Sequence, residues 1–211
     1  MLGAGGFIGR RVVAALAATD WAVPIAAIHR GAPPRDVDSV RLDATRRDEL
    51  APALARADGI VSCVAGDPAT IVGAARALFE AAAALPRPPR VVHLSSMAVY
   101  GAASGVVDES APLRGDLSPY AAAKVEAEAL ARSCPSVVHL RPGLVYGPAS
   151  REWSDYVGRW LAARRLGDLG AAGRGCCDLV YVEDVAAAVL RALRQPDIDG
   201  QAFNLAPSAC A

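Results

Sequence analysis

Stretches that favour β-strands alternate with stretches that favour helices along almost the whole chain of 211 residues. Short apolar runs predict strands at residues 23–28, 40–42, 60–64, 91–94, 137–140 and 202–205. Between them, stretches rich in alanine, which accounts for 46 residues, predict helices at 10–18, 47–57, 69–85, 119–132 and 184–193. Helices of this length form crossover connections between parallel strands and cover both faces of the sheet. The sequence therefore predicts an α/β fold with a doubly wound parallel sheet.

A glycine-rich turn with the sequence GAGGFIG stands directly before the first predicted helix, with Gly3, Gly6 and Gly9 at every third position. Glycine permits a tight turn, and its missing Cβ lets a pyrophosphate approach the backbone. The free N–H groups and the dipole at the start of the following helix favour a bound phosphate. The turn therefore predicts a dinucleotide site, although so short a pattern, taken alone, also fits an ordinary turn.

Tyr120 and Lys124 are four residues apart at the start of a predicted helix, with Ser118 as the expected N-cap and Pro119 as the first helical residue. This spacing places both side chains on one helical face. An ammonium group beside the phenol would stabilise the phenolate, lower the tyrosine pKa from about 10 and make it a base near neutral pH. The spacing alone also fits a solvated face, but Lys124 is the only lysine in a chain with 21 arginines.

Ser95 and Ser96 directly follow the predicted strand at residues 91–94. In an open parallel sheet, ligands bind at the carboxyl ends of the strands. A serine hydroxyl at this place can donate a hydrogen bond to a substrate carbonyl or alkoxide oxygen. A serine that only caps a turn is the alternative.

The balance of 22 basic and 22 acidic residues gives no electrostatic reason to expect nucleic acid or an anionic membrane as a partner. No apolar run reaches the ~18 residues of a membrane span, and the N-terminus lacks a signal-peptide pattern. The five cysteines are odd in number and lack C-x-x-C spacing; they lie at positions 63, 134, 176, 177 and 210. This pattern argues against a disulfide framework or a zinc site, and we expect a cytoplasmic protein without a metal.

In this order, the motifs resemble those of the extended short-chain dehydrogenase/reductase family, also described as NAD-dependent epimerase/dehydratases. Besides the glycine turn, the family's S-S-x-x-V-Y-G stretch matches residues 95–101, and its Y-x-x-x-K motif matches Tyr120 and Lys124. Its later R-P-G-x-V-Y-G-P and V-x-D-V-A stretches match residues 141–148 and 182–186. The resemblance covers nearly the whole chain and implies a Rossmann-type fold.

The resemblance also implies which residues form the site. Tyr120 would exchange a proton with a substrate hydroxyl or carbonyl group, Lys124 would lower the tyrosine pKa and contact the nicotinamide ribose, and Ser96 would orient the oxygen. Asp43 matches the acidic residue that usually meets the adenine. The implied cofactor contacts are Gly3, Gly6, Phe7, Ile8, Gly9, Arg30, Asp43, Ala44, Ala65, Tyr120, Lys124 and Pro142.

The cofactor itself is NAD or NADP. The family's usual acidic residue after the second strand is missing, because residues 27–31 read AIHRG. A carboxylate there would bind the ribose hydroxyls of NAD, whereas an arginine accommodates the 2′-phosphate of NADP. Arg30 therefore favours NADP.

The ends of the chain depart from the family pattern. The family has a complete strand before the glycine turn, whereas only Met1 and Leu2 precede it here, and the family continues well past residues 203–205. We therefore expect a largely missing first strand and a reduced C-terminal substrate lobe, as truncation at both ends would produce. The strands at 23–28 and 60–64 would then each have an unpaired inner edge, which predicts poor expression or weak cofactor binding.

We divide the chain into a dinucleotide-binding domain at residues 1–148 and a partial substrate-side region at 149–211, interleaved with the last elements of the sheet. The resemblance implies an NAD(P)-dependent epimerase, dehydratase or oxidoreductase that acts on a hydroxyl or carbonyl group, with a nucleotide sugar as substrate. Two alternatives stay open: a reductase or dehydrogenase of a small carbonyl compound or sterol-like alcohol, and a non-catalytic dinucleotide-binding remnant. A homodimer would also agree with the resemblance.

Overall fold

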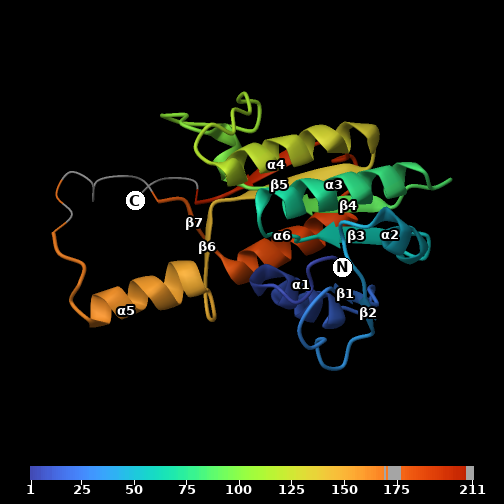
Figure 1. The fold of residues 1–211 in the computed structure, drawn as a ribbon, viewed down its shortest axis with the longest axis horizontal. Coiled ribbons are helices and arrows are strands. Elements are labelled where there is room, and N and C mark those ends of the chain that lie inside the picture. The colour runs from blue at the N-terminus through green and yellow to red at the C-terminus, as the bar shows by residue number, and fades with distance from the viewer. Residues whose placement is uncertain (169, 171–176, 208–211) are drawn as a thin grey trace.

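The structure is a computed structural model that describes residues 1–168, 170 and 177–207. Its centre is a parallel sheet with helices on both faces, and a helical segment projects from one end (Figure 1). The strands are β1 (Ala26–Ile28), β2 (Ser39–Arg41), β3 (Gly59–Ser62), β4 (Arg90–Leu94), β5 (Val137–Pro142), β6 (Leu144–Tyr146), β7 (Leu179–Tyr181) and β8 (Ala202–Leu205). The helices are α1 (Phe7–Ala17), α2 (Arg47–Leu54), α3 (Pro68–Ala83), α4 (Pro119–Leu130), α5 (Val157–Ala162) and α6 (Val182–Arg194), with the 3₁₀ turns η1 (Met97–Tyr100) and η2 (Ala131–Ser133) and the π-helical turn η3 (Arg151–Tyr156).

The two parts of the main sheet, β2-β1 and β3-β4-β5-β8, are joined by Leu2, which forms parallel bridges to β1 and β3. The Leu2 N–H donates to the Val61 carbonyl oxygen at 2.8 Å, and the Leu2 carbonyl accepts from the Cys63 N–H at 3.1 Å. The Met1 carbonyl also accepts from a β1 N–H, that of Ala27, at 2.8 Å. Two residues thus occupy the place of the expected first strand. The prediction that both neighbouring strands have unpaired inner edges is wrong at this point, because one residue can bond to both sides.

Successive residues of the central strands pack on opposite faces of the sheet, as the pleat requires. On β4, Val91 belongs to the apolar cluster under α2, α3 and α4, and Val92 belongs to the cluster under α1 and α6. Both valines are fully buried. The helices therefore form the two outer layers that the alternating sequence predicts, and the doubly wound α/β fold is confirmed.

Several element boundaries differ from the prediction. The strand expected from residue 23 begins at Ala26, since Pro24 has no N–H to contribute to a ladder. The first helix begins at Phe7, directly after the glycine turn, rather than at residue 10. The strands β6 and β7, each of three residues, pair in parallel and were not predicted, because such short runs carry little periodicity.

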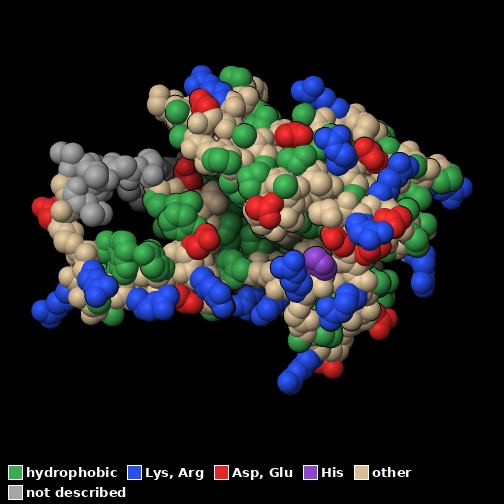
Figure 2. All heavy atoms as spheres, in the orientation of Figure 1, with side chains coloured by type: hydrophobic (Ala, Val, Ile, Leu, Met, Phe, Trp, Pro, Cys, Tyr) green, Lys and Arg blue, Asp and Glu red, His purple; other side chains and the backbone are tan. Residues whose placement is uncertain are grey.

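Residues 151–162 form the projecting segment, which consists of η3 and α5 (Figure 1). None of its residues is buried, and several large apolar side chains are exposed. They are Trp153, Tyr156, Val157, Trp160 and Leu161. Figure 2 shows apolar side chains gathered on this projection, beside the main body of the molecule.

Within the described residues, no helix is both long and apolar enough to span a bilayer. Cys63, Cys134 and Cys177 are free thiols, while Cys176 and Cys210 lie outside the described residues. The same part of the chain contains no cluster of three or more potential metal ligands.

Candidate functional site

Two adjoining cavities lie at the carboxyl ends of the strands, the region where open α/β sheets bind ligands. The larger, about 900 Å³, extends from the glycine turn to α4 and residues 149–153. The smaller, about 270 Å³, extends from the same turn to the ends of β1 and β2. Phe7, Ile8, Gly9, Ser96, Tyr120, Lys124 and Pro142 line the larger cavity, Gly3, Arg30, Asp43 and Ala44 line the smaller, and Gly6 and Ala65 line both. The structure thus brings every predicted site residue to one of these two spaces.

The glycine turn forms a close-packed cradle at the start of α1. Gly3 has a positive φ of 71°, and a Cβ there would lie 2.7 Å from the Cys63 carbonyl oxygen. A Cβ on Gly9 would lie 2.1 Å from the Gly3 carbonyl oxygen. Gly6 is the N-cap of α1, and no side chain caps the helix. The N–H groups of the first turn therefore remain available to an anion, so the turn fits a pyrophosphate.

The first turns of α4 carry Tyr120 and Lys124. The helix begins as the sequence predicts: the Ser118 hydroxyl accepts from the Ala121 N–H at 3.1 Å, and Pro119 is the first helical residue. Lys124 is only 3% exposed, and its Nζ donates to the Leu94 carbonyl oxygen at 2.8 Å. The same Nζ lies 5.8 Å from the centre of the Tyr120 ring. The ammonium group is thus fixed between the end of β4 and the phenol.

The pKa values of this pair follow from burial. Burial lowers the pKa of Lys124 to about 8, against an opposing contribution from Cys63 and Glu128. Burial also raises the pKa of Tyr120, although a hydrogen bond with Ser96 lowers it in part and the charge of Glu152 raises it further. The net direction for Tyr120 is opposite to the sequence-based expectation, because the loss of hydration outweighs the hydrogen bond with Ser96.

The two serines after β4 differ in their surroundings. The Ser96 hydroxyl caps η1, where it accepts from the Ala98 N–H at 3.2 Å, so the capping role considered above is present beside any catalytic one. Ser95 is 3% exposed, and within the described chain its buried hydroxyl has no well-directed hydrogen bond, although it is close enough to Glu128 to lower the pKa of that carboxyl group. A buried hydroxyl without a good partner is costly. Its place at the larger cavity fits a site that takes a polar ligand.

The smaller cavity has a polar rim formed by the ends of β1 and β2. One oxygen of Asp43 accepts from the N–H and the hydroxyl of Thr45, at 2.9 and 2.8 Å, and these hydrogen bonds lower the pKa of Asp43. Arg30 is exposed at the same rim. Arg41 donates to the carbonyl oxygens of His29 and Gly31, the two neighbours of Arg30 in the chain, at 3.0 and 3.2 Å. Arg41 thereby holds the loop that carries Arg30.

The sequence model of the NAD dependent epimerase/dehydratase family matches residues 1–206. The chain belongs to this family. None of the curated proteins compared with it gives a match.

Solved structures share the fold of this family member. UDP-glucuronic acid 4-epimerase from Bacillus cereus, in complex with UDP-glucuronic acid and NAD, has a TM-score of 0.82 and 22% identity over 99% of this chain and 77% of that one. MoeE5 in complex with UDP-glucuronic acid and NAD has a TM-score of 0.78 and 26% identity, over 100% of this chain and 76% of that one. The human epimerase family protein SDR39U1 (isoform 2) with NADPH has a TM-score of 0.80 and 20% identity, over 99% of this chain and 74% of that one.

Arg141, from one of the later family motifs, is the centre of a buried network behind the candidate site. Arg141, in the R-P-G motif, donates from Nε and Nη2 to the two carboxylate oxygens of Glu128 on α4, at 3.0 and 2.7 Å. Its Nη1 donates to the Tyr100 hydroxyl of η1 at 2.7 Å, and that hydroxyl donates to Asn204 Oδ1 of β8 at 2.7 Å. The network joins the elements that carry Ser96 and Lys124 to the central sheet. The network therefore supports the elements that line the candidate site.

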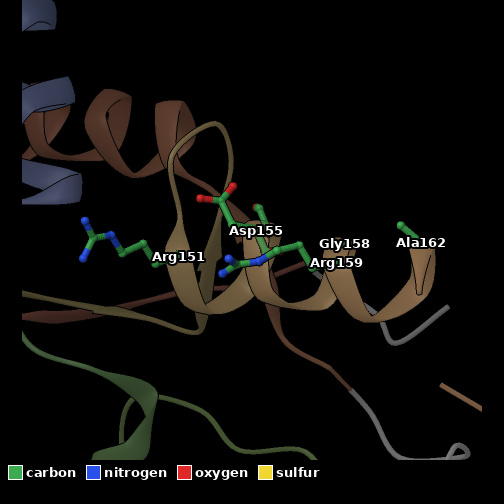
Figure 3. A pocket seen from close by; sticks show the side chains of 6 residues that line it. Arg151, Asp155, Gly158, Arg159 and Ala162 are labelled. Atoms are coloured by element: carbon green, nitrogen blue, oxygen red, sulfur yellow. The ribbon is translucent and has the colours of Figure 1, made fainter. Parts of the chain in front are cut away.

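Three further residues that line the larger cavity were not predicted from the sequence. Glu152 and Trp153 line it from η3, and Arg11 lines it from α1. Their only signal was their place directly after the Y-G-P motif and the glycine turn. A separate hollow runs along residues 151–162 (Figure 3); it is lined by Arg151, Ser154, Asp155, Gly158, Arg159 and Ala162. A single stretch of chain forms that hollow, and no predicted site residue lies in it.

Proposed function

We propose that this family member uses a nicotinamide dinucleotide to oxidise or reduce a hydroxyl- or carbonyl-bearing carbon of a nucleotide sugar. Ser96, Tyr120 and Lys124 are its catalytic residues in this proposal. One observation carries it: these three side chains line the same cavity as the glycine turn and the start of α1. A phosphate site and an acid–base pair therefore open into one space, as dinucleotide-dependent proton and hydride transfer requires.

The cofactor would be held by the chain at three places. The glycine turn and the first N–H groups of α1 suit its pyrophosphate, the rim with Arg30 and Asp43 suits its adenosine end, and Lys124 suits the ribose next to the nicotinamide. When bound, the nicotinamide ring accepts or supplies the hydride.

The chain itself handles the proton. The Tyr120 hydroxyl group, as phenolate, takes the proton of a substrate hydroxyl group during oxidation and returns one during reduction. The ammonium of Lys124, held by the Leu94 carbonyl oxygen, stabilises the phenolate. Ser96 donates a hydrogen bond to the substrate oxygen, where negative charge develops. Epimerisation returns the hydride to the opposite face of the same carbon, whereas a reductase releases its product.

Separate observations support the substrate class and the cofactor preference. UDP-glucuronic acid in the complexes of the B. cereus epimerase and of MoeE5 supports a nucleotide sugar. Arg30 at the rim of the smaller cavity supports NADP, whose 2′-phosphate an arginine accommodates. Arg30 equally favours the second candidate, an NADPH-dependent reductase of a small carbonyl compound. Dissociation constants for NADH and NADPH, measured by fluorescence, test the preference, and tighter NADH binding would contradict it.

Tyr120→Phe tests the mechanism, because it keeps the ring and removes only the titrating hydroxyl group. We expect kcat to fall by about 10²–10⁴-fold and the cofactor dissociation constant to change only a few-fold. The assay compares UDP-glucose, UDP-glucuronic acid and a small aldehyde as substrates for the unsubstituted chain. Turnover by the Phe variant near the normal rate would remove Tyr120 from the mechanism. Turnover of the aldehyde alone would favour the reductase, and cofactor binding without any turnover would favour a non-catalytic protein.

A further inference from the structure

The strongest electrostatic feature outside the proposed catalytic set is the buried pair of Glu128 and Arg141. Glu128 lies one turn after Lys124 on α4, so both side chains are on the same helical face. Lys124, Glu128 and Arg141 are all less than a tenth exposed. Both carboxylate oxygens of Glu128 are held by Arg141, which fixes their position beside the helix. A cation, an anion and a second cation are thus enclosed together behind the cavity.

The other titratable groups that face Lys124 carry no charge near neutral pH. Cys63, at the end of β3, has its thiol pKa raised to about 12 by burial. His93 on β4 has its pKa lowered by burial, and its Nδ1 lies 3.1 Å from Nδ1 of His139 on β5, whose pKa burial also lowers. Tyr120 has its pKa raised. Each of these groups is therefore neutral near neutral pH, the range in which Lys124 must be charged.

Two carboxylates remain. The charge of Glu152 acts on Tyr120, but Glu152 is exposed to solvent, which screens this charge. Burial raises the pKa of Glu128, yet the hydrogen bonds from Arg141, together with contributions from His139, Ser95 and the charge of Arg141, outweigh this effect, and the net shift is downward. Glu128 is therefore ionised at neutral pH, and it is the buried anion next to Lys124.

We infer that Glu128, oriented by Arg141, is a positioning residue that keeps the buried ammonium of Lys124 charged. Taking an ammonium out of water favours its neutral form, and a neutral amine could not stabilise a phenolate. An ionised carboxylate on the same helical face favours the charged ammonium and so opposes the effect of burial. Arg141 is required because an acid buried alone would itself become neutral. The catalytic consequence rests on the proposed function, but the charge of Lys124 can be measured without substrate or cofactor.

The composition of the chain makes this measurement simple, because Lys124 is its only lysine. Protein labelled with ¹³Cε-lysine gives one Cε signal, whose chemical shift reports the charge of the ammonium group through a pH titration. We expect the Lys124 pKa to be about 8 in the unsubstituted chain. We expect it to fall by about one unit in Glu128→Gln. In Glu128→Asp, which keeps the negative charge, the Lys124 pKa should stay close to that of the unsubstituted chain.

A matched control lies on the same helix. Glu126 is exposed and pairs with Arg76 at 3.5 Å, so Glu126→Gln should leave the Lys124 titration unchanged. Because Glu128→Gln leaves Arg141 buried without its partner and can fail to fold, the double variant Glu128→Gln/Arg141→Gln provides a second test with neither charge. A Lys124 pKa equal to that of the unsubstituted chain in Glu128→Gln, or in the double variant if the single variant does not fold, would overturn the inference. A lowered pKa together with an active Tyr120→Phe variant would uphold it and reject the proposed mechanism instead.

Discussion

The layer that carries the proposed catalytic residues and the segment at residues 151–162 border the same cavity but are built in opposite ways. Ser96 comes after β4 and Lys124 lies on α4, and the buried ion pair of Glu128 and Arg141 ties α4 to the central strands. The segment at residues 151–162 has no buried residue and exposes apolar side chains (Figure 2). The wall of the cavity formed by α4 and the end of β4, the buried wall, is thus well supported. The wall formed by the start of the segment at residues 151–162, the exposed wall, has little support.

This difference agrees with separate roles for the two walls, one in proton transfer and the other in substrate recognition. Proton transfer requires groups held within a fraction of an ångström, which only a supporting network provides. Substrate recognition tolerates change, and it is commonly placed on segments outside the packed scaffold. In the proposed enzyme, residues 151–162 would therefore select the substrate, and the α4 wall would carry out the chemistry.

The largest effect is expected from breaking the buried ion pair. Arg141→Met leaves Glu128 buried without its partner, and we expect the free energy of unfolding to fall by about 3–5 kcal/mol. Arg159→Met, in the exposed segment, should change it by less than about 0.5 kcal/mol. Denaturant unfolding of both variants measures the contrast. Equal losses would show that the two walls are equally well supported.

Two glycines provide a second contrast. In Gly9→Ala the new Cβ would overlap the Gly3 carbonyl oxygen, so we expect a loss of about 1–3 kcal/mol and weaker binding of NADPH. Gly158 lies in α5, where a Cβ would meet no atom within 4 Å. Gly158→Ala should therefore stabilise the chain by up to about 1 kcal/mol. If Gly9→Ala binds NADPH normally in a calorimetric titration, the glycine turn is not the pyrophosphate cradle.

Acid should lower the free energy of unfolding through the two buried histidines of the central strands, and we expect this effect to be smaller than those of the substitutions above. Burial lowers the pKa of His93 and of His139, so both are neutral in the folded chain at a pH where they take up protons in the unfolded chain. The unfolded state then binds more protons, and the free energy of unfolding should fall as the pH drops below about 6.5. Unfolding curves at pH 7.5 and 5.5 measure this change. The double variant His93→Leu/His139→Leu should show a smaller dependence, and an identical dependence would contradict the assignment.

The smallest effect on stability is expected at the exposed wall. Trp153→Ala should change the free energy of unfolding by no more than about 0.5 kcal/mol, because the side chain lies at the surface of the projecting segment. NADPH binding should also be unchanged, whereas KM for a UDP-sugar should rise several-fold. A variant with normal KM would show that this segment does not contact the substrate.

Much of the fold could be predicted because its signals are local in the chain. Alternating apolar and alanine-rich runs indicated the parallel sheet and its two helical layers, and Ser118 and Pro119 indicated the start of α4. The short strands β6 and β7 could not be predicted, since their pairing joins Leu144 to Leu179 across 35 positions of the sequence. The role of Leu2 was missed for the same reason, because its partners in β1 and β3 are distant in the chain.

For the site, local sequence already specifies which groups stand on one helical face or in one turn: Tyr120 with Lys124, and Gly3 with Gly9. Their relative placement follows from helix and turn geometry, which depends on near neighbours alone. The folded chain was needed to show that these groups share a cavity with Ser96 and that Arg141 pairs with Glu128. It also decided the direction of the Tyr120 pKa, because desolvation depends on how many atoms of the whole fold surround a group, and no local pattern encodes that number.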